Sequence, residues 1–196
     1  MVRQIRIFIE GGGNDPDLLR SGLSRFFWKA GVRCRVVACG GRDTAFRKWR
    51  TACSSRSESL NILVVDSEGP ISTTPRRHLE KNDPSWLIPS GCDDQLHLMV
   101  QMMEAWFLAD PEALAKYYGQ HFGAKALPAR ENVEQVAKAD IERSLKEATR
   151  RTQKGEYHKI RHASDLLARI DPAKVRKRAP HCERLLTTLA RAQGGV

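Results

Sequence analysis

The sequence predicts an α/β fold in which helices flank a parallel sheet and a helical C-terminal extension follows. Two observations carry this prediction. The first 70 residues alternate β-branched, aromatic segments with segments of helical apolar spacing, an order typical of right-handed β-α-β crossovers. The uninterrupted apolar run at 62–65 is typical of a central parallel strand that helices cover on both faces. We place the α/β domain at 1–125 and the extension, packed on it, at 126–196.

The first strand is expected at 3–9, because this segment is rich in β-branched isoleucine and also contains an aromatic phenylalanine. Asp15 is then a suitable N-cap for a helix whose apolar residues recur at helical spacing over 16–30. Gly31 ends that helix, and a second strand follows at 32–38.

Asp43 is expected to cap a second helix that runs to about Cys53, before the third strand. The proline-rich stretch 69–92 is expected to be a long irregular connection that acts as a lid or binding loop. For 97–103 we favour a fourth strand over a helix continuous with 105–118, because Glu104 would then follow a strand as the other acids do.

The chain is expected to be wholly helical from about Val133. Asp171-Pro172 and Ala179-Pro180 indicate helix starts in this part. The segment 141–196 holds 14 Lys and Arg against 6 Asp and Glu, a local net charge of +8, which suits a nucleic acid backbone.

Composition narrows the class of protein. With 41% apolar residues the 196-residue chain is too hydrophobic to be disordered, and no run of 18 apolar residues predicts a membrane span. An odd number of cysteines, five, without a Cys-x-x-Cys pair argues against a disulfide framework and a zinc site. We therefore expect a cytoplasmic protein. The net charge of +10 favours an anionic partner, most commonly nucleic acid, although a well-solvated basic surface has the same composition.

Acidic residues follow three of the expected strands. Glu10 ends the first, Asp66 and Glu68 end the third, and Glu104 follows the fourth. Because the carboxyl ends of parallel strands meet at one edge, these side chains are expected to converge, and a divalent cation would relieve their repulsion. Oxygen ligands suit Mg²⁺ or Mn²⁺. The alternatives are ordinary acids that cap turns or, for Glu104, an acid at a helix N-terminus.

Three glycines follow Glu10 directly. Gly11, Gly12 and Gly13 would let the backbone approach an anion next to a helix N-terminus. Glycines between a strand and a helix more often form a simple turn.

A lone glutamate after strand one and an acidic pair after strand three resemble the Toprim domain of topoisomerases, primases and OLD-type nucleases. Toprim domains have Asp-x-Asp where this chain has Asp66-Ser67-Glu68. More narrowly, the chain is similar from about residue 5 to 187 to an uncharacterised bacterial Toprim-like family. The segments that carry this similarity are Glu10-Gly11-Gly12-Gly13, Asp66-Ser67-Glu68, Asp93-Asp94-Gln95, Glu104-Ala105-Trp106 and Tyr157-His158-Lys159.

The resemblance implies roles for individual residues. Glu10, Asp66 and Glu68 would bind the metal, Glu104 would be a further ligand or orient water, and Lys159 would stabilise charge on the phosphate. Further candidate nucleic acid contacts are Lys154, Arg161 and His162. His162 and His158, four residues apart, suit a metal site or acid–base chemistry, although a stacked pair on a helix surface is the more frequent arrangement.

The four tryptophans are expected to have different roles. Trp28, Trp49 and Trp106 are expected in the core. Trp86, in the proline-rich stretch, is the candidate for a substrate contact.

Two functions are therefore considered. The first is a metal-dependent nuclease acting on DNA or RNA, transfer RNA included; the resemblance implies an SMC/ABC-type ATPase partner and a role in phage defence. The second is a non-catalytic module that docks to nucleic acid or to an ATPase. A haloacid-type phosphatase is disfavoured, since its acidic pair follows the first strand. Oligomerisation is left open.

Overall fold

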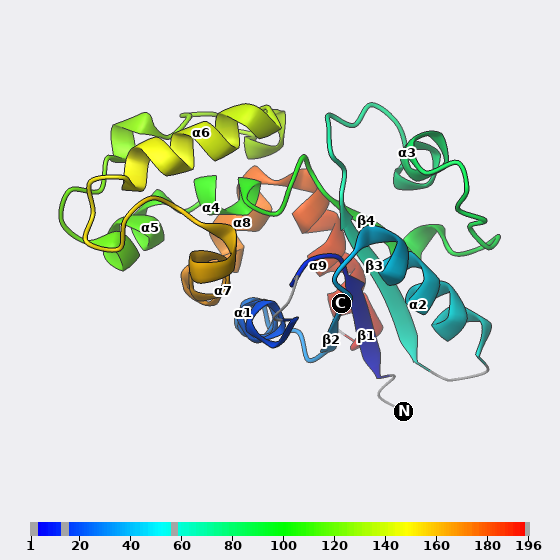
Figure 1. Cartoon of the computed structure of the whole chain (residues 1–196). Helices are drawn as coiled ribbons and strands as arrows, with labels where there is room; N and C mark the ends of the chain where they lie inside the picture. The colour runs from blue at the N-terminus through cyan, green and yellow to red at the C-terminus, as the bar shows by residue number, and fades with distance from the viewer. Residues whose placement is uncertain (1–3, 13–15, 56–58, 195–196) are drawn as a thin grey trace.

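Parallel strands in the order β2-β1-β3-β4 form the sheet of the computed structural model, which describes residues 4–12, 16–55 and 59–194 (Figure 1). The strands are β1 (Ile5–Ile9), β2 (Arg35–Ala38), β3 (Leu60–Asp66) and β4 (Leu96–Met99). Every strand pair is parallel. The predicted α/β class is confirmed. Asp15 and Gly13 lie outside the described residues, so the predicted cap at Asp15 stays a prediction.

One face of the sheet packs against α1 (Pro16–Lys29) and the C-terminal helices. Ile5, Ile7 and Ile9 of β1 point into this core and are almost completely buried. In Figure 1, α1 and α7 lie together on this side of the sheet. The same hydrophobic core continues from the strands into the helices that follow β4, so both predicted domains contribute to it.

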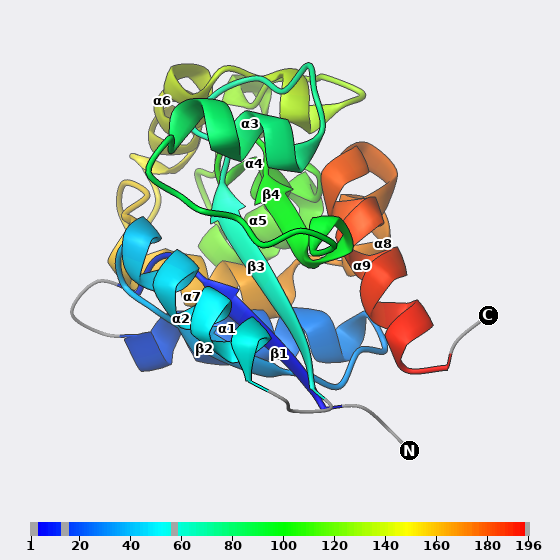
Figure 2. The same ribbon diagram turned by 90° about the vertical axis from the view of Figure 1, so that its right-hand side faces the viewer.

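The other face packs against α2 (Arg42–Ser54) and α3 (Pro75–Asn82), which face the viewer in Figure 2. Two predictions are corrected here. Gly41, not Asp43, is the N-cap of α2. The stretch 69–92 contains α3, whose start is fixed by Thr74: the Thr74 hydroxyl accepts the Arg77 N–H at 3.3 Å, and proline follows at the first helical position.

The fourth strand is shorter than predicted, because the chain leaves the sheet after Met99 and residues 100–103 form a loop. Glu104 consequently lies at the N-cap of a helix, not at a strand end. The helices of this part are α4 (Ala105–Leu108), α5 (Pro111–Tyr118), α6 (Lys138–Thr149), α7 (Lys159–Arg169), α8 (Pro172–Arg178) and α9 (Pro180–Ala192). Short 3-10 turns lie at Asp93–Gln95, Ala124–Ala126 and Val133–Gln135.

The helix starts predicted at Asp171 and Ala179 are confirmed as N-caps of α8 and α9. The C-terminal part is not wholly helical, however, because an irregular loop over 150–158 separates α6 from α7. This loop contains Tyr157, whose hydroxyl contacts Glu104.

Helices α1 and α7 approach unusually closely. A side chain at position 22 would run into the backbone of Ser164, so only glycine fits there. The Ser164 hydroxyl donates to the Leu18 carbonyl at 2.5 Å, and Lys29 Nζ donates to the Arg169 carbonyl at the end of α7 at 2.8 Å. The N-terminal and C-terminal parts of the chain are thus joined through backbone groups as well as through apolar contacts.

The tryptophans are distributed differently from the prediction. Trp49 and Trp106 are buried as expected, but Trp28 is 72% exposed because it lies off the buried stripe of α1. Trp86 is 5% exposed and stacks on Phe46 with ring centroids 4.2 Å apart, which leaves its rings little surface for a substrate. Among the described helices, none is long and apolar enough to cross a membrane.

Candidate functional site

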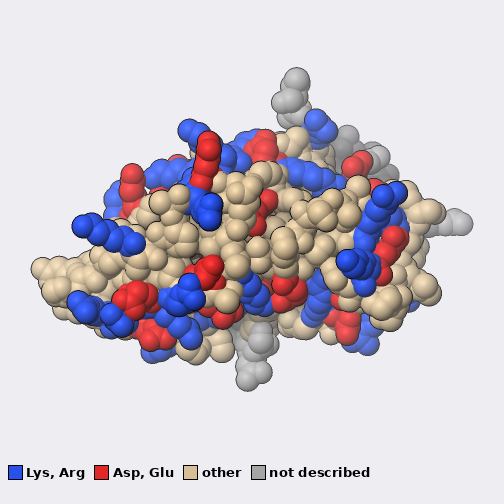
Figure 3. Space-filling model, turned by 90° about the horizontal axis from the view of Figure 1, so that it is seen from above, with Lys and Arg blue, Asp and Glu red and all other residues tan. Residues whose placement is uncertain are grey.

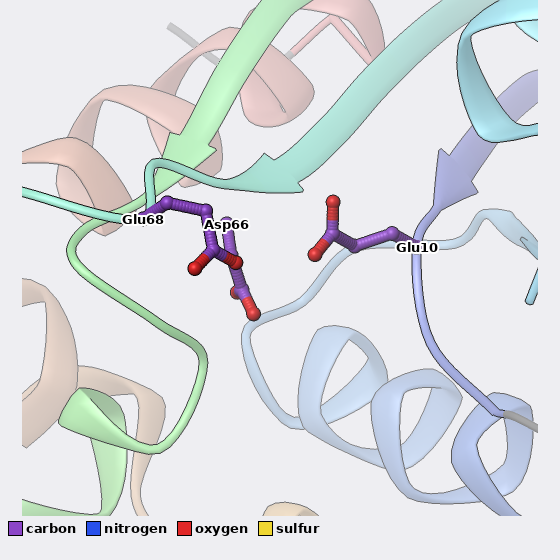
Figure 4. Close-up of side chains that lie close together, drawn as sticks. All are labelled: Glu10, Asp66 and Glu68. Atoms are coloured by element: carbon purple, nitrogen blue, oxygen red, sulfur yellow. The ribbon is translucent and has the colours of Figure 1, made fainter. Parts of the chain in front are cut away.

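Three carboxylates meet at the carboxyl edge of the sheet. Oxygens of Glu10, Asp66 and Glu68 lie within 4.8 Å of one another, and Figure 4 shows the side chains directed into a common space. They converge because β1 and β3 are adjacent parallel strands, with Ile9 opposite Val64. The predicted convergence of these acids is therefore a feature of the structure.

Asp66 is the most buried of the three, with a side chain 6% exposed. Its Oδ1 accepts the Met103 N–H at 2.8 Å. Burial is the main reason that its pKa is raised to about 8; the Lys159 ammonium opposes the rise, and the charges of Glu10 and Glu104 add to it. At neutral pH this carboxyl therefore holds a proton more readily than an ordinary aspartate does.

Glu10 and Glu68 each face a basic side chain. Arg42 Nη1 donates to Glu10 Oε2 at 3.1 Å and to the Asp66 carbonyl at 2.5 Å. Burial nevertheless raises the pKa of Glu10, against the opposing effect of Arg42. Lys138 Nζ pairs with Glu68 Oε2. Glu68 has φ 61, in the left-handed region that non-glycine residues rarely adopt, a strain of about 1–3 kcal/mol of the kind that clusters at functional sites.

Arg42 is itself fixed by its neighbours. Its Nε and Nη2 donate to the two carboxylate oxygens of Asp83 at 3.0 and 2.8 Å, a bidentate pair. The guanidinium also lies 5.2 Å from the ring centroid of Trp86, whose Nε1–H donates to Asp43 Oδ1 at 2.9 Å. The segment after α3 therefore orients the cation that contacts Glu10.

A second layer lies beside Asp66. The Glu104 side chain is 2% exposed, and its Oε1 accepts the Tyr157 hydroxyl at 3.1 Å. Lys159 Nζ lies 3.3 Å from Glu104 Oε1 and 3.9 Å from Asp66 Oδ2. Burial alone would lower the pKa of Lys159, but the carboxylates of Glu104 and Asp66 outweigh it and raise that pKa, so the ammonium stays charged.

The donor set suits a divalent cation. Carboxylate oxygens are the ligands that Mg²⁺ and Mn²⁺ prefer, and a cation would offset both the burial and the repulsion that raise the pKa of Asp66. On the face seen from above the sheet, acidic and basic side chains are interspersed (Figure 3). The cluster itself has the same mixture of charges, because Arg42, Lys138 and Lys159 lie beside its carboxylates.

The structure brings together five of the predicted site residues and leaves others apart. Glu10, Asp66, Glu68, Glu104 and Lys159 form one connected cluster.

The remaining candidates lie elsewhere or serve the fold. Lys154 is exposed and lies over the Tyr117 ring at 4.7 Å, and Arg161 is exposed on α7. His162 is only 5% exposed, and its Nδ1 accepts the His158 N–H at 2.9 Å. The nucleic acid contact predicted for His162 is therefore corrected to a structural role in the helix start.

The glycines after β1 form a turn. The Gly11 N–H donates to the Gly40 carbonyl at 2.7 Å, so that donor is already used. Gly11 and Gly12 have φ of 104 and 96, and side chains at these positions would meet Leu19 and Pro16. An anion-binding role for Gly11 and Gly12 stays a prediction, and Gly13 lies outside the described residues.

Sequence reasoning missed three residues that contact the cluster: Arg42, Lys138 and Tyr157. Tyr157 stands in the segment Tyr157-His158-Lys159, so its proximity to the lysine was a usable signal. Arg42 and Lys138 are basic residues among 33 and stand in no motif, so only the fold identifies them.

Comparisons with known proteins add one match. The model of a family described as Domain of unknown function (DUF4276) matches residues 9–190. No curated protein and no solved structure gives a significant match. The matched segment includes all five residues of the cluster. The chain therefore belongs to the DUF4276 family.

Proposed function

We propose that the protein is a nuclease that hydrolyses phosphodiester bonds of DNA or RNA with Mg²⁺ or Mn²⁺. The observation that carries the proposal is the convergence of the carboxylate oxygens of Glu10, Asp66 and Glu68 within 4.8 Å. A divalent cation bound by these oxygens would polarise a phosphodiester and activate water.

The residues beside the acids have separate roles in this proposal. Lys159 is 47% exposed on its side chain, so its ammonium can turn toward a phosphate whose negative charge grows during hydrolysis. Glu104 holds Lys159 in place, and Tyr157 holds Glu104 through the 3.1 Å hydrogen bond. The raised pKa of Asp66 favours its protonated form. Metal binding would release that proton, and the carboxylate would then serve as an anionic ligand.

The test is cleavage of labelled single-stranded and double-stranded DNA and RNA with Mg²⁺, Mn²⁺ or EDTA. We expect metal-dependent cleavage that Glu10→Gln or Asp66→Asn abolishes. Asp17→Asn is the matched control, because that side chain is 72% exposed on α1 and is not one of the three converging carboxylates. A Glu10→Gln/Asp66→Asn double variant that cleaves as well as the wild type contradicts the proposal.

One observation favours the second candidate function, a non-catalytic module. Each carboxylate already faces a cation of the chain: Glu10 faces Arg42, Glu68 faces Lys138, and Asp66 faces Lys159. A metal must compete with these pairs. Calorimetric titration with Mn²⁺ separates the two functions: saturable binding supports the nuclease, and its absence together with intact nucleic acid binding supports the module.

We further propose that an SMC/ABC-type ATPase controls this activity in phage defence, on the basis of the resemblance described above. Expression of the wild type should be toxic to a bacterial host when genes encoded beside it are included, and Glu10→Gln should remove the toxicity. Equal toxicity of both proteins would contradict this part of the proposal.

A further inference from the structure

A hollow of about 630 Å³ lies between β1 and α2, on the opposite face of the sheet from α1. We name it the α2 groove. Phe8 and Ala52 give it an apolar floor, and the residues around them are basic or carry hydroxyl groups. These surrounding residues include Arg6, Arg47, Lys48, Thr44 and Thr51. Of the described residues that line the groove, none is acidic.

The groove is open because α2 is centred on β3. The buried face of α2 consists of Ala45, Phe46 and Trp49. Trp49 Nε1–H donates to the Asn61 carbonyl of β3 at 3.2 Å, and Phe46 stacks on Trp86. The buried face of α2 is therefore directed toward β3 and Trp86, and Phe8 of β1 lies beside the helix in the lining of the groove.

The Thr44 end of the groove is the end nearer the carboxylate cluster in the fold. Phe8 lines the groove from within β1, and Glu10 directly follows Ile9, the last residue of that strand. Thr44 lies two residues after Arg42, whose guanidinium contacts Glu10. From this end the helix runs for 13 residues, about 20 Å at 1.5 Å per residue, away from the carboxyl edge.

We propose that the α2 groove binds the sugar-phosphate backbone of a single-stranded nucleic acid whose end enters the carboxylate cluster. Arginine, lysine and hydroxyl side chains are the groups that contact phosphate and sugar, and an apolar floor suits a base or a sugar ring. A flexible single strand fits best, because the Asp66 side chain is only 6% exposed and a rigid duplex would be held away from it. The choice of nucleic acid among polyanions rests on the proposed function; the groove itself does not.

Nucleic acid would then contact α2, and not the C-terminal segment as the sequence predicts. Arg47 and Lys48 are both exposed, and they stand beside each other on the rim of the groove. Arg143 on α6 and Arg150 at the C-cap of that helix are also exposed, outside the groove. Removing either pair changes the net charge equally, so a difference between the two variants reports position and not charge.

The experiment measures binding of a fluorescently labelled 20-nucleotide single strand by anisotropy, in EDTA, from 50 to 200 mM salt. We expect Arg47→Ala/Lys48→Ala to weaken binding about tenfold or more at low salt and to reduce the slope of log K against log salt by about 1.4, which is roughly 0.7 for each lost phosphate contact. Arg143→Ala/Arg150→Ala should leave both quantities near the wild-type values. Unfolding midpoints of both variants, measured in parallel, should match the wild type.

Equal effects of the two variants, or none, overturn the inference. A wild-type chain that binds no oligonucleotide at 50 mM salt but binds polyglutamate through Arg47 and Lys48 overturns the choice of nucleic acid in favour of an acidic protein. Because EDTA prevents metal-dependent cleavage, a failure of the nuclease proposal does not affect this measurement. If the protein shows no nuclease activity but Arg47→Ala/Lys48→Ala still weakens oligonucleotide binding, the α2 groove remains the binding site for the oligonucleotide.

Discussion

Replacing Asp66 with asparagine should stabilise the fold while it removes the proposed metal ligand. The Asp66 side chain is buried, and its pKa is about 8 in the folded chain against an ordinary value of 3.8. Because the folded state holds a proton that the unfolded chain has released, the free energy of unfolding falls as pH rises from about 4 to about 8. Asparagine is neutral and keeps the oxygen that accepts the Met103 N–H. It therefore avoids this loss.

The size of the effect follows from the difference in pKa. At about 1.4 kcal/mol per pKa unit, the roughly three units between the ordinary aspartate pKa and pH 7 correspond to about 4 kcal/mol. Water and side-chain relaxation around a buried carboxyl reduce such values, so we expect Asp66→Asn to gain about 2–4 kcal/mol at pH 7. The gain should shrink toward pH 4 and level off above pH 8.

Urea denaturation of both proteins in EDTA, at pH 4.5, 6, 7 and 8.5, measures this difference. Asp17→Asn, which changes an exposed carboxylate, should stay within about 0.5 kcal/mol of the wild type throughout. If Asp66→Asn is less stable than the wild type and the difference does not change with pH, the reasoning about the buried carboxyl is refuted.

Three further predictions concern metal, packing and acid stability. Mg²⁺ at about 100 times its Kd should raise the free energy of unfolding of the wild type by about 2.7 kcal/mol, and that of Glu10→Gln by much less; equal gains in thermal denaturation would contradict a site at Glu10. Gly22→Ala should cost about 1–3 kcal/mol in urea denaturation, because the added methyl group meets the Ser164 backbone, and a neutral result would show that α1 and α7 can separate. Asp110→Ala should cost about 2–4 kcal/mol at pH 7, since a buried carboxylate that accepts from Lys174 is lost. Although burial opposes it, Lys174 lowers the pKa of Asp110, so the part of this cost that comes from the ion pair should be lost as pH falls below the ordinary aspartate range. A cost that does not change with pH in acid denaturation would argue against the ion pair.

The sheet and its acids were predictable because the responsible signals are local. Apolar runs that end in acidic residues predict both the strands and the edge at which Glu10 and Asp66 meet. Fold class and the convergence of the acids followed from this pattern alone.

Other features depend on contacts between distant parts of the chain. Lys138 pairs with Glu68 from 70 residues away, and Arg42 contacts Glu10 from 32 residues away, so no spacing rule identifies either. Helix α3 had a usable signal in Thr74-Pro75, which the surrounding prolines concealed. Trp28 lies beside the buried stripe of α1 and not on it, a distinction of one helical position.

The close contact between α1 and α7 has a consequence for dividing the chain. Glu10 precedes α1, and Lys159 is the first residue of α7. These two members of the cluster are therefore positioned by the two helices that are in close contact at Gly22 and Ser164. An expression fragment ending at residue 125 would lose Lys159 and Tyr157 and would expose the apolar side of α1 to water. Co-expression of separate fragments 1–125 and 126–196 should restore a folded protein only if they associate through that helix pair, which makes the chain a natural subject for split-protein reconstitution.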